Sequence, residues 1–283
     1  MFTKPNNNQF FLNCGGQLIS LAQPKVMGIL NLTPDSFFDG GKYIQEADFL
    51  KQTEKMLREG ADFIDLGAAS TRPGADLLAA EQEIKRLLPA LEAIKIEFPE
   101  AIISIDTYQS KVAAKALECG ADIINDISAG FLDDQMMSVV AKYKVPYIMM
   151  HMRGNPQTMS GLTQYEDVVK EMMLHFSERI QKARSLGLND LMIDPGFGFA
   201  KTVEQNFEIL QKLELFNLLE LPILAGLSRK SMIYKTLKVN PEESLTGTIA
   251  LNMTALHKGA KILRVHDVKA AVETVQLFGQ MEL

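Results

Sequence analysis

The stretch Leu191-Met-Ile-Asp-Pro-Gly-Phe-Gly-Phe-Ala-Lys201 decides the fold. Three apolar residues run directly into Asp194, and the Pro and Gly that follow end any strand. A short apolar run bounded by such breakers is typical of a buried strand. The carboxylate therefore lies where a strand ends and a loop begins, which is where a barrel of parallel strands keeps its chemistry. We expect Asp194 to bind a flat, hydrogen-bonding ligand, with the other strand ends closing around it.

A related pattern recurs outward along the chain. Gly60–Asp65, Gly120–Asn125 and Gly259–Arg264 each contain a glycine that stops a helix, a short connection, an apolar strand and a polar end. This recurrence indicates a repeated αβ unit. Apolar strands that alternate with helices predict a parallel sheet covered on both faces.

The spacing predicts eight core strands, at 26–31, 63–67, 102–106, 122–126, 146–151, 191–194, 222–226 and 261–265. Helices are expected at 46–58, 81–98, 109–117, 133–142, 165–186, 203–213, 242–258 and 268–278. Apolar runs at 10–12 and 18–21 around a Gly pair predict an N-terminal β-hairpin that plugs the barrel bottom.

The length of 283 residues suits a closed (β/α)8 TIM barrel, an α/β fold that typically takes roughly 250 residues. No linker interrupts the chain, so residues 1–283 are expected to form one domain. An open doubly wound sheet is the alternative. It would favour a glycine-rich first turn with dinucleotide-binding spacing, which residues 31–41 lack.

Composition excludes several classes of protein. The net charge of -6 argues against a nucleic-acid binder. Cys14 and Cys119 alone provide neither a disulfide framework nor a zinc site, which suits a reducing compartment. No apolar signal core occupies residues 1–10, and no run approaches the roughly 20 apolar residues of a membrane span. A soluble cytoplasmic protein with no membrane partner is expected.

Polar residues stand at nearly every strand end. In a barrel we expect their side chains to point into one cavity. Any one of them alone is readily explained as a capped turn, but so many together are not, because buried polar groups need partners that a ligand can supply. The set comprises Asn31, Asp65, Asp106, Asn125, His151, Asp194, Arg229 with Lys230, and Arg264 with His266.

Asp106, Asn125 and Asp194 are mainly hydrogen-bond acceptors. They suit a heterocycle that presents adjacent N–H and NH₂ donors, as guanine and pterins do, because one carboxylate accepts two such hydrogens. Lys230 could donate to a ring carbonyl or ring nitrogen. A carboxylate pair for acid–base or metal chemistry is the alternative for Asp106 and Asp194, and the lack of a His-rich ligand set weighs against it.

Basic residues indicate an anion site. The cationic group is Arg72, Arg229, Lys230, Arg264 and His266. Arg264 and His266 lie two positions apart at a strand end and suit a clamp for phosphate or diphosphate. Arg229 is equally explained as a surface salt bridge. Asn31, at the root of the first long loop, could bind a magnesium ion that mainly holds phosphate oxygens. Phe37 and Phe38 in that loop favour a lid.

The two most distinctive segments are Gly28-Ile-Leu-Asn-Leu-Thr-Pro-Asp-Ser-Phe-Phe-Asp-Gly-Gly41 and Gly67-Ala-Ala-Ser-Thr-Arg-Pro-Gly74. Shorter motifs follow at Ser104–Thr107, Asn125–Ile127, Met150–Met152, Asp194–Phe199, Ser228–Ser231 and Arg264–Val268. Over about residues 26–272, these segments and their order resemble the dihydropteroate synthase family.

The resemblance implies a TIM barrel that condenses 6-hydroxymethyl-7,8-dihydropterin diphosphate with p-aminobenzoate in folate biosynthesis. It implies Mg²⁺ at Asn31, sulfonamide sensitivity and a homodimer. By resemblance, the pterin diphosphate is bound by Thr71, Asp106, Asn125, Asp194, Lys230, Arg264 and His266, of which Asp106, Lys230, Arg264 and His266 are catalytic. The p-aminobenzoate is framed by Phe37, Arg72, Pro73, Phe199 and Ser231.

Two positions depart from the family pattern. Ala200 stands where many members have Gly, and its methyl group is tolerable unless the position needs a positive φ. Phe38 stands where Ser is common. A pterin-dependent methyltransferase would keep the pterin-facing acceptors but has no use for an anion clamp. A non-enzymatic pterin binder would be expected to lose Asn31, Arg264 or the long loops. The sequence therefore favours the synthase.

Overall fold

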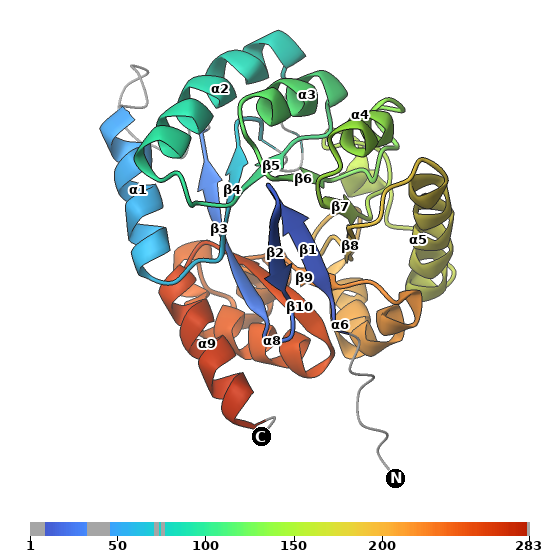
Figure 1. Cartoon of the computed structure of the whole chain (residues 1–283). Helices are drawn as coiled ribbons and strands as arrows, with labels where there is room; N and C mark the ends of the chain where they lie inside the picture. Colours follow the sequence, from blue (N-terminus) through green and yellow to red (C-terminus); the bar gives the residue numbers. More distant parts are fainter. Residues whose placement is uncertain (1–8, 33–45, 71–73, 75–76, 282–283) are drawn as a thin grey trace.

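Eight parallel strands close into a barrel with helices outside it (Figure 1). The computed structural model describes residues 9–32, 46–70, 74 and 77–281. The strands follow one another in chain order, and β10 closes the barrel against β3, so the predicted TIM barrel is confirmed and the open sheet is excluded. The barrel strands are β3 (Lys25–Asn31), β4 (Phe63–Gly67), β5 (Ile103–Asp106), β6 (Ile123–Asp126), β7 (Tyr147–Met150), β8 (Leu191–Asp194), β9 (Ile223–Ala225) and β10 (Ala260–Val265).

The helices lie close to their predicted positions, with one exception. They are α1 (Glu46–Arg58), α2 (Ala80–Glu97), α3 (Ser110–Glu118), α4 (Met136–Tyr143), α5 (Val168–Ser185), α6 (Val203–Gln211), α7 (Ser231–Leu237), α8 (Leu245–His257) and α9 (Val268–Met281). Helix α7 was not predicted, because seven residues give too little apolar periodicity to identify a helix. Residues 241–243 form a separate 3₁₀ turn rather than the start of α8.

Side chains alternate between the barrel interior and the helix layer along each strand, since successive residues of a strand point to opposite faces. Near the bottom, one interior cluster contains Phe63, Ile123, Ile148, Met192 and Ile262. Two residues further along the same strands stand Asp65, Asn125, Met150, Asp194 and Arg264. The barrel interior therefore has an apolar layer beneath a largely polar one. Because every second residue of a strand faces the interior, the polar residues at the strand ends come together in one layer.

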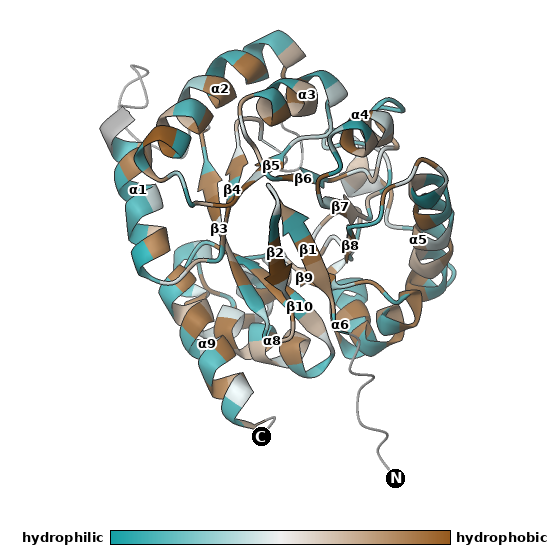
Figure 2. Ribbon diagram, viewed as in Figure 1, coloured by the Kyte–Doolittle hydropathy of each residue, from teal (hydrophilic) through white to brown (hydrophobic). Residues whose placement is uncertain are grey.

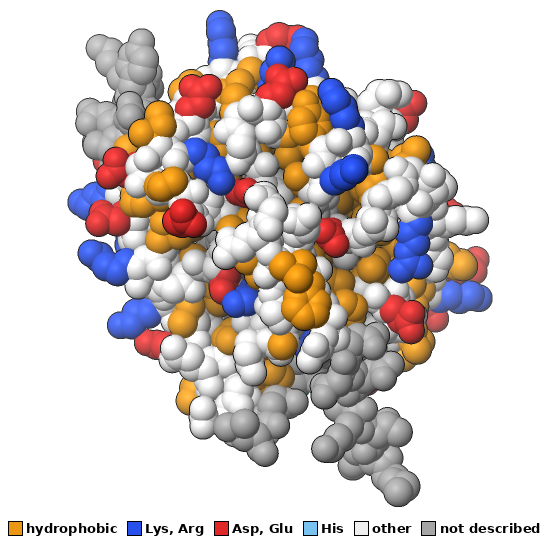
Figure 3. Space-filling view, in the orientation of Figure 1, with side chains coloured by type: hydrophobic (Ala, Val, Ile, Leu, Met, Phe, Trp, Pro, Cys, Tyr) orange, Lys and Arg blue, Asp and Glu red, His pale blue; other side chains and the backbone are white. Residues whose placement is uncertain are grey.

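The predicted hairpin is present and closes the bottom of the barrel. Strands β1 (Phe11–Cys14) and β2 (Gln17–Ser20) pair antiparallel and lie across the near mouth of the barrel in Figure 1. Leu12, Cys14 and Leu21 pack into the lower interior cluster. Figure 3 shows this face, with charged side chains spread over the surrounding helices and apolar ones near the hairpin. Because the hairpin fills this end, a ligand must enter from the other.

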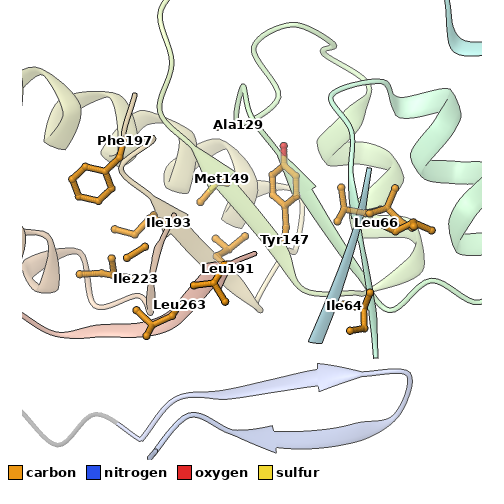
Figure 4. Packing of buried hydrophobic residues seen from close by; sticks show 14 of the residues in the cluster. Ile64, Leu66, Ala129, Tyr147, Met149, Leu191, Ile193, Phe197, Ile223 and Leu263 are labelled. Atoms are coloured by element: carbon orange, nitrogen blue, oxygen red, sulfur yellow. The ribbon is translucent and has the colours of Figure 1, made fainter. Parts of the chain in front are cut away.

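The second apolar layer lies between the strands and the helices. The outward residues of the strands, such as Ile64, Met149 and Ile193, pack there with the inner faces of the helices (Figure 4). The helices are correspondingly two-sided in hydropathy (Figure 2). Among the residues that the structure describes, no helix has the length and apolar character to cross a membrane.

Candidate active site

The polar layer lines a pocket at the carboxyl ends of the strands. Asp106, Asn125, Asp194, Lys230 and Arg264 all line it, so the structure brings together five of the predicted pterin-site residues. Apolar walls are provided by Ile127, Met150, Phe197 and Phe199. A pocket with apolar walls and a few converging polar groups is suited to a flat heterocycle.

Arg264 lies between two carboxylates inside the barrel. Its Nε donates to Asp65 Oδ2 at 2.6 Å, and its Nη2 donates to Asp106 Oδ2 at 2.7 Å. Within the described part of the chain, the second oxygen of each carboxylate is buried without a hydrogen-bond partner. Burial raises the pKa of Asp106 to about 7 despite the Arg264 contact. Buried unpaired acceptors of this kind require a donor, which a ligand can supply.

Asn125 and Asp194 present their acceptors to the same space. Asn125 Nδ2 donates to Asp65 Oδ2 at 3.0 Å, so the amide oxygen of Asn125 is the atom left to accept. Asp194 Oδ1 accepts from the backbone N–H of Gly196 at 2.7 Å, which holds the carboxylate at the strand end. Burial raises the pKa of Asp194. Both groups therefore favour a ligand edge that donates hydrogen bonds.

Lys230 reaches the pocket from the loop after β9. Its Nζ lies 4.4 Å from the ring centroid of Phe199, which gives the ammonium a cation–π contact. Burial, with the charge of Arg264 nearby, lowers the pKa of Lys230 to about 8. Ser231 is the first residue of α7, directly after Lys230, at the same rim.

Asn31 and His266 line a neighbouring groove, which runs between β3 and α1. A Cβ at Gly67 would lie 3.6 Å from Asn31 Oδ1 and 3.7 Å from Asp106 Oδ2, so glycine keeps this junction of groove and pocket open. His266 belongs to the same strand end as Arg264. Asn31 and His266 thus lie in the groove next to the pocket that Arg264 and Lys230 line.

The expectation that every polar strand end faces one cavity is wrong for His151. Met150 points inward and lines the pocket, so the next residue points to the helix layer. The His151 ring packs there against His175 at a centroid distance of 4.9 Å. Burial lowers the pKa of His151 well below its usual value.

Arg229 does not join the pocket either. Its Nε donates to Asp267 Oδ2 at 3.0 Å and its Nη2 to Asp267 Oδ1 at 2.7 Å. This bidentate pair is the salt bridge that the sequence offered as the alternative explanation. The predicted Phe37, Thr71, Arg72 and Pro73, and also Phe38, lie outside the described residues.

Lys201 and Asp65 support the pocket. The sequence predicted that Asp65 points into the cavity but offered no role for Lys201. Lys201 is buried, and its Nζ donates to the carbonyls of His151, Gly196 and Phe199 at 3.2, 3.0 and 2.9 Å. It thereby fixes the loop that carries Phe199. Asp65 is the strand-end residue that holds Arg264 and Asn125, as its place at a polar strand end led us to expect, whereas no sequence signal marks Lys201.

Ala200 in this loop has a φ of +50° and is buried. The position therefore adopts the left-handed conformation, the condition under which the methyl group was expected to matter. A non-glycine residue in this region has a backbone cost of roughly 1–2 kcal/mol. The Tyr165 hydroxyl donates to the Ala200 carbonyl at 3.0 Å, and this bond helps to hold the strained turn.

Comparison with known proteins agrees with this geometry. A profile of the family described as pterin binding enzyme matches residues 27–266. The Escherichia coli dihydropteroate synthase is 42% identical over 264 residues, which cover 93% of each chain. The chain belongs to the dihydropteroate synthase family. The Synechocystis dihydropteroate synthase is 45% identical over 251 residues, covering 88% of this chain and 86% of that protein.

Solved structures of dihydropteroate synthases share the whole fold. The Xanthomonas albilineans enzyme with 4-aminobenzoic acid has a TM-score of 0.90 and 37% identity, covering 97% of this chain and 99% of its own. The Yersinia pestis enzyme in a sulfonamide drug complex has a TM-score of 0.91 and 37% identity, covering 96% and 99%. The enzyme class expected from the sequence, a transferase, is therefore confirmed at the level of the family.

Proposed function

We propose that the pocket joins 6-hydroxymethyl-7,8-dihydropterin diphosphate to p-aminobenzoate, giving 7,8-dihydropteroate and diphosphate. The observation that carries this proposal is the convergence of Asp106, Asn125, Asp194, Lys230 and Arg264 on one pocket in a chain of this family. The acceptors of Asn125 and Asp194 match the N–H and NH₂ edge of a pterin. Lys230 donates to the opposite, acceptor-bearing part of the ring.

The reaction needs little acid–base assistance from the chain. The bond from the exocyclic carbon to the diphosphate oxygen breaks, and the electron pair leaves with diphosphate. The ring spreads the positive charge that develops, and Asp106 stabilises it. The neutral amine of p-aminobenzoate then forms the carbon–nitrogen bond and loses a proton. The chain mainly orients the two partners and excludes water from the cation.

Arg264 and His266 form the anion side of the proposed site. The guanidinium of Arg264 remains charged at all relevant pH values, and it lies at the edge where the diphosphate would extend from the ring. Phe199 and Ser231 flank the rim where the second substrate would bind, and we propose Phe37, Thr71, Arg72 and Pro73 as further contacts. A sulfonamide that resembles p-aminobenzoate would compete at this rim.

The residues fit a magnesium ion held mostly by its substrate. Asn31 offers a neutral amide oxygen near the Asp106 carboxylate, since a Cβ at Gly67 would contact both side chains, and hard oxygen ligands suit Mg²⁺. Within the described residues, no group of three or more His, Cys, Asp or Glu could hold a metal alone. We propose that Asn31 binds Mg²⁺ together with diphosphate oxygens. The ion would neutralise charge on the leaving diphosphate.

A pair of substitutions tests the assignment of the two substrate positions. Asp194→Ala should abolish dihydropterin binding in calorimetry, because the edge loses its bidentate acceptor. Ser231→Ala should mainly raise the KM for p-aminobenzoate. Equal and mild effects of both would contradict the assignment. Diphosphate release on mixing both substrates with magnesium distinguishes a synthase from a methyltransferase or a pterin-binding protein without activity.

We also propose that residues 1–283 form one domain and that the protein acts as a cytoplasmic homodimer. Both substrates fit the pocket of a single chain in this proposal, so dimerisation would support the fold rather than complete the site. Light scattering coupled to size exclusion measures the mass in solution, and a monomeric mass at micromolar concentration would contradict the dimer.

A further inference from the structure

Two adjacent residues of the loop after β9 are joined to two adjacent residues at the end of β10. Arg229 makes the bidentate ion pair with Asp267, at 3.0 and 2.7 Å. Ser228 Oγ lies 3.0 Å from His266 Nδ1 and also accepts from the backbone N–H of His266 at 3.2 Å. We name these four residues the double rung. The ion pair of Arg229 with Asp267 keeps Ser228 aligned with His266.

The double rung keeps a strained turn in place. Arg229 has a φ of +56°, which is unfavourable for a residue with a side chain. Its backbone N–H donates to Thr248 Oγ1 at 3.2 Å, and the ion pair with Asp267 restrains the other end of the residue. The turn therefore keeps Ser228 beside His266 and directs Lys230 into the pocket.

The hydrogen bonds of Ser228 decide which nitrogen of His266 bears the proton. A serine hydroxyl has one proton to donate and two lone pairs to accept with. Its oxygen already accepts from the His266 backbone. If Nδ1 also donated to it, the hydroxyl proton would be buried without an acceptor among the described residues, because Ser228 is only 4% exposed. The satisfied arrangement is Ser228 O–H donating to Nδ1, which leaves the ring proton on Nε2.

We propose that Ser228 is a positioning residue that holds His266 as a neutral imidazole with its N–H at Nε2, aimed at the departing diphosphate. This inference rests on the proposed function for the identity of the anion, but not for the state of the ring. His266 lines the groove that it shares with Asn31, while Nδ1 faces the buried Ser228. The opposite side of the ring is therefore the one that a ligand in the groove meets.

The local charges agree with a neutral ring. Desolvation at Nδ1, with the positive charges of Arg264 and Arg229, lowers the pKa of His266, although the other side of the residue is exposed and Asp267 opposes the shift. The sequence led us to expect two cations in the anion clamp. With a neutral His266, the clamp instead has one cation, Arg264, and one neutral hydrogen-bond donor. A neutral donor binds an anion more weakly than a charged one does, so the product diphosphate is held less tightly after the bond has broken.

The tautomer can be measured directly, because the chain contains only four histidines. The full-length protein, labelled with ¹⁵N-histidine, gives two-bond proton–nitrogen correlation spectra in which a protonated ring nitrogen is distinct from an unprotonated one. His266→Asn identifies the His266 signals by their loss. At pH 7 the expected result is an unprotonated Nδ1 and a protonated Nε2 for His266. A protonated Nδ1, or a doubly protonated ring, would overturn the inference.

Substitution of Ser228 adds a kinetic measurement. Ser228→Ala should shift the Nδ1 signal of His266 towards that of an imidazole exchanging freely between tautomers. It should raise the KM for the pterin diphosphate about 3- to 10-fold, as expected for one lost hydrogen bond, with a smaller change in kcat. Ser228→Thr keeps a hydroxyl and should restore both values. The matched control is Ser185→Ala, which removes an exposed hydroxyl that donates to Lys182 O at 2.7 Å on α5.

The two measurements separate this inference from the proposed function. If Ser228→Ala leaves the His266 signals unchanged, or if its KM matches that of Ser185→Ala, Ser228 does not position the ring and the inference fails. If the wild-type ring has its proton on Nε2 but the protein releases no diphosphate, the proposed function fails and the ring assignment is upheld.

Discussion

Asp65 Oδ2 on β4 accepts a hydrogen bond from Arg264 Nε on β10 at 2.6 Å, over the intervening strand β3, although the two residues lie 199 positions apart in the chain. The same oxygen accepts from Asn125 Nδ2 at 3.0 Å. One carboxylate beneath the pocket thus orients two of the groups proposed to contact the ligand, one cationic and one neutral.

Asp65→Asn should therefore damage the site without touching a substrate. The amide keeps the volume but removes the charge between Arg264 and Asn125. A loss of about 2–3 kcal/mol is expected, which corresponds to a fall in kcat/KM of roughly 30- to 150-fold. Steady-state kinetics with both substrates measure it. Glu118→Gln, in an exposed ion pair with Lys115, is the control. An equally small effect of both substitutions would show that Asp65 does not orient the site.

Ala200→Gly should stabilise the protein. Glycine relieves the cost of a φ of +50°, and its greater freedom in the unfolded chain offsets part of this gain. The net increase in the free energy of unfolding is expected to be about 0.5–1 kcal/mol, measured by urea denaturation. Ala93→Gly inside α2 serves as the contrast, because there glycine should destabilise by about 1 kcal/mol. A destabilising effect at both positions contradicts the strain argument.

Mild acid should weaken the fold through His175. Burial lowers the pKa of His175 to about 4, so between this value and its ordinary 6.5 the unfolded chain binds the extra proton and the folded protein does not. The contribution of neutral His175 to the free energy of unfolding is therefore complete above pH 6.5 and declines as the pH falls towards 4. The expected loss from this group between pH 7 and 5 is about 2 kcal/mol.

Urea denaturation of His175→Gln at pH 7, 6 and 5 checks that loss. The variant is less stable at pH 7 because it disturbs packing, but its stability should fall less steeply with acid than that of the wild type. Exposed His257 provides the matched substitution, His257→Gln, which should keep the wild-type slope. Parallel slopes for the wild type and His175→Gln would rule out His175 as the source.

Magnesium removal should stop turnover and leave the fold intact. Chelation is expected to abolish diphosphate release with no change in the circular dichroism spectrum, since the hairpin and the apolar layers hold the barrel together. Asn31→Ala should raise the magnesium concentration needed for half-maximal rate by at least roughly tenfold. Calorimetry of Mg²⁺ binding in the presence of diphosphate provides a second readout. Full activity in a chelator, or an unchanged magnesium requirement in Asn31→Ala, would contradict the proposed ligand.

The sequence by itself determined the barrel, because its evidence is local. Apolar strands alternate with amphipathic helices, and the glycine stops at Gly60, Gly120 and Gly259 recur before strands with polar ends. The carboxyl ends of parallel strands meet at one end of a barrel whatever the side chains are, so Asp194 and its counterparts could be assigned to a common rim. Short elements such as α7 were missed because seven residues show too little periodicity.

Only the tertiary structure decided which of those rim residues meet. Successive side chains of a strand alternate between the interior and the helix layer, so Asp194 points inward and His151 points away. An error of one residue in a predicted strand would exchange the inward and outward residues. Contacts such as Asp65 with Arg264 and Ser228 with His266 join segments far apart in sequence, and no local pattern encodes them. Pairing of this kind depends on the closure of the barrel, which brings strands β4, β9 and β10 around one interior.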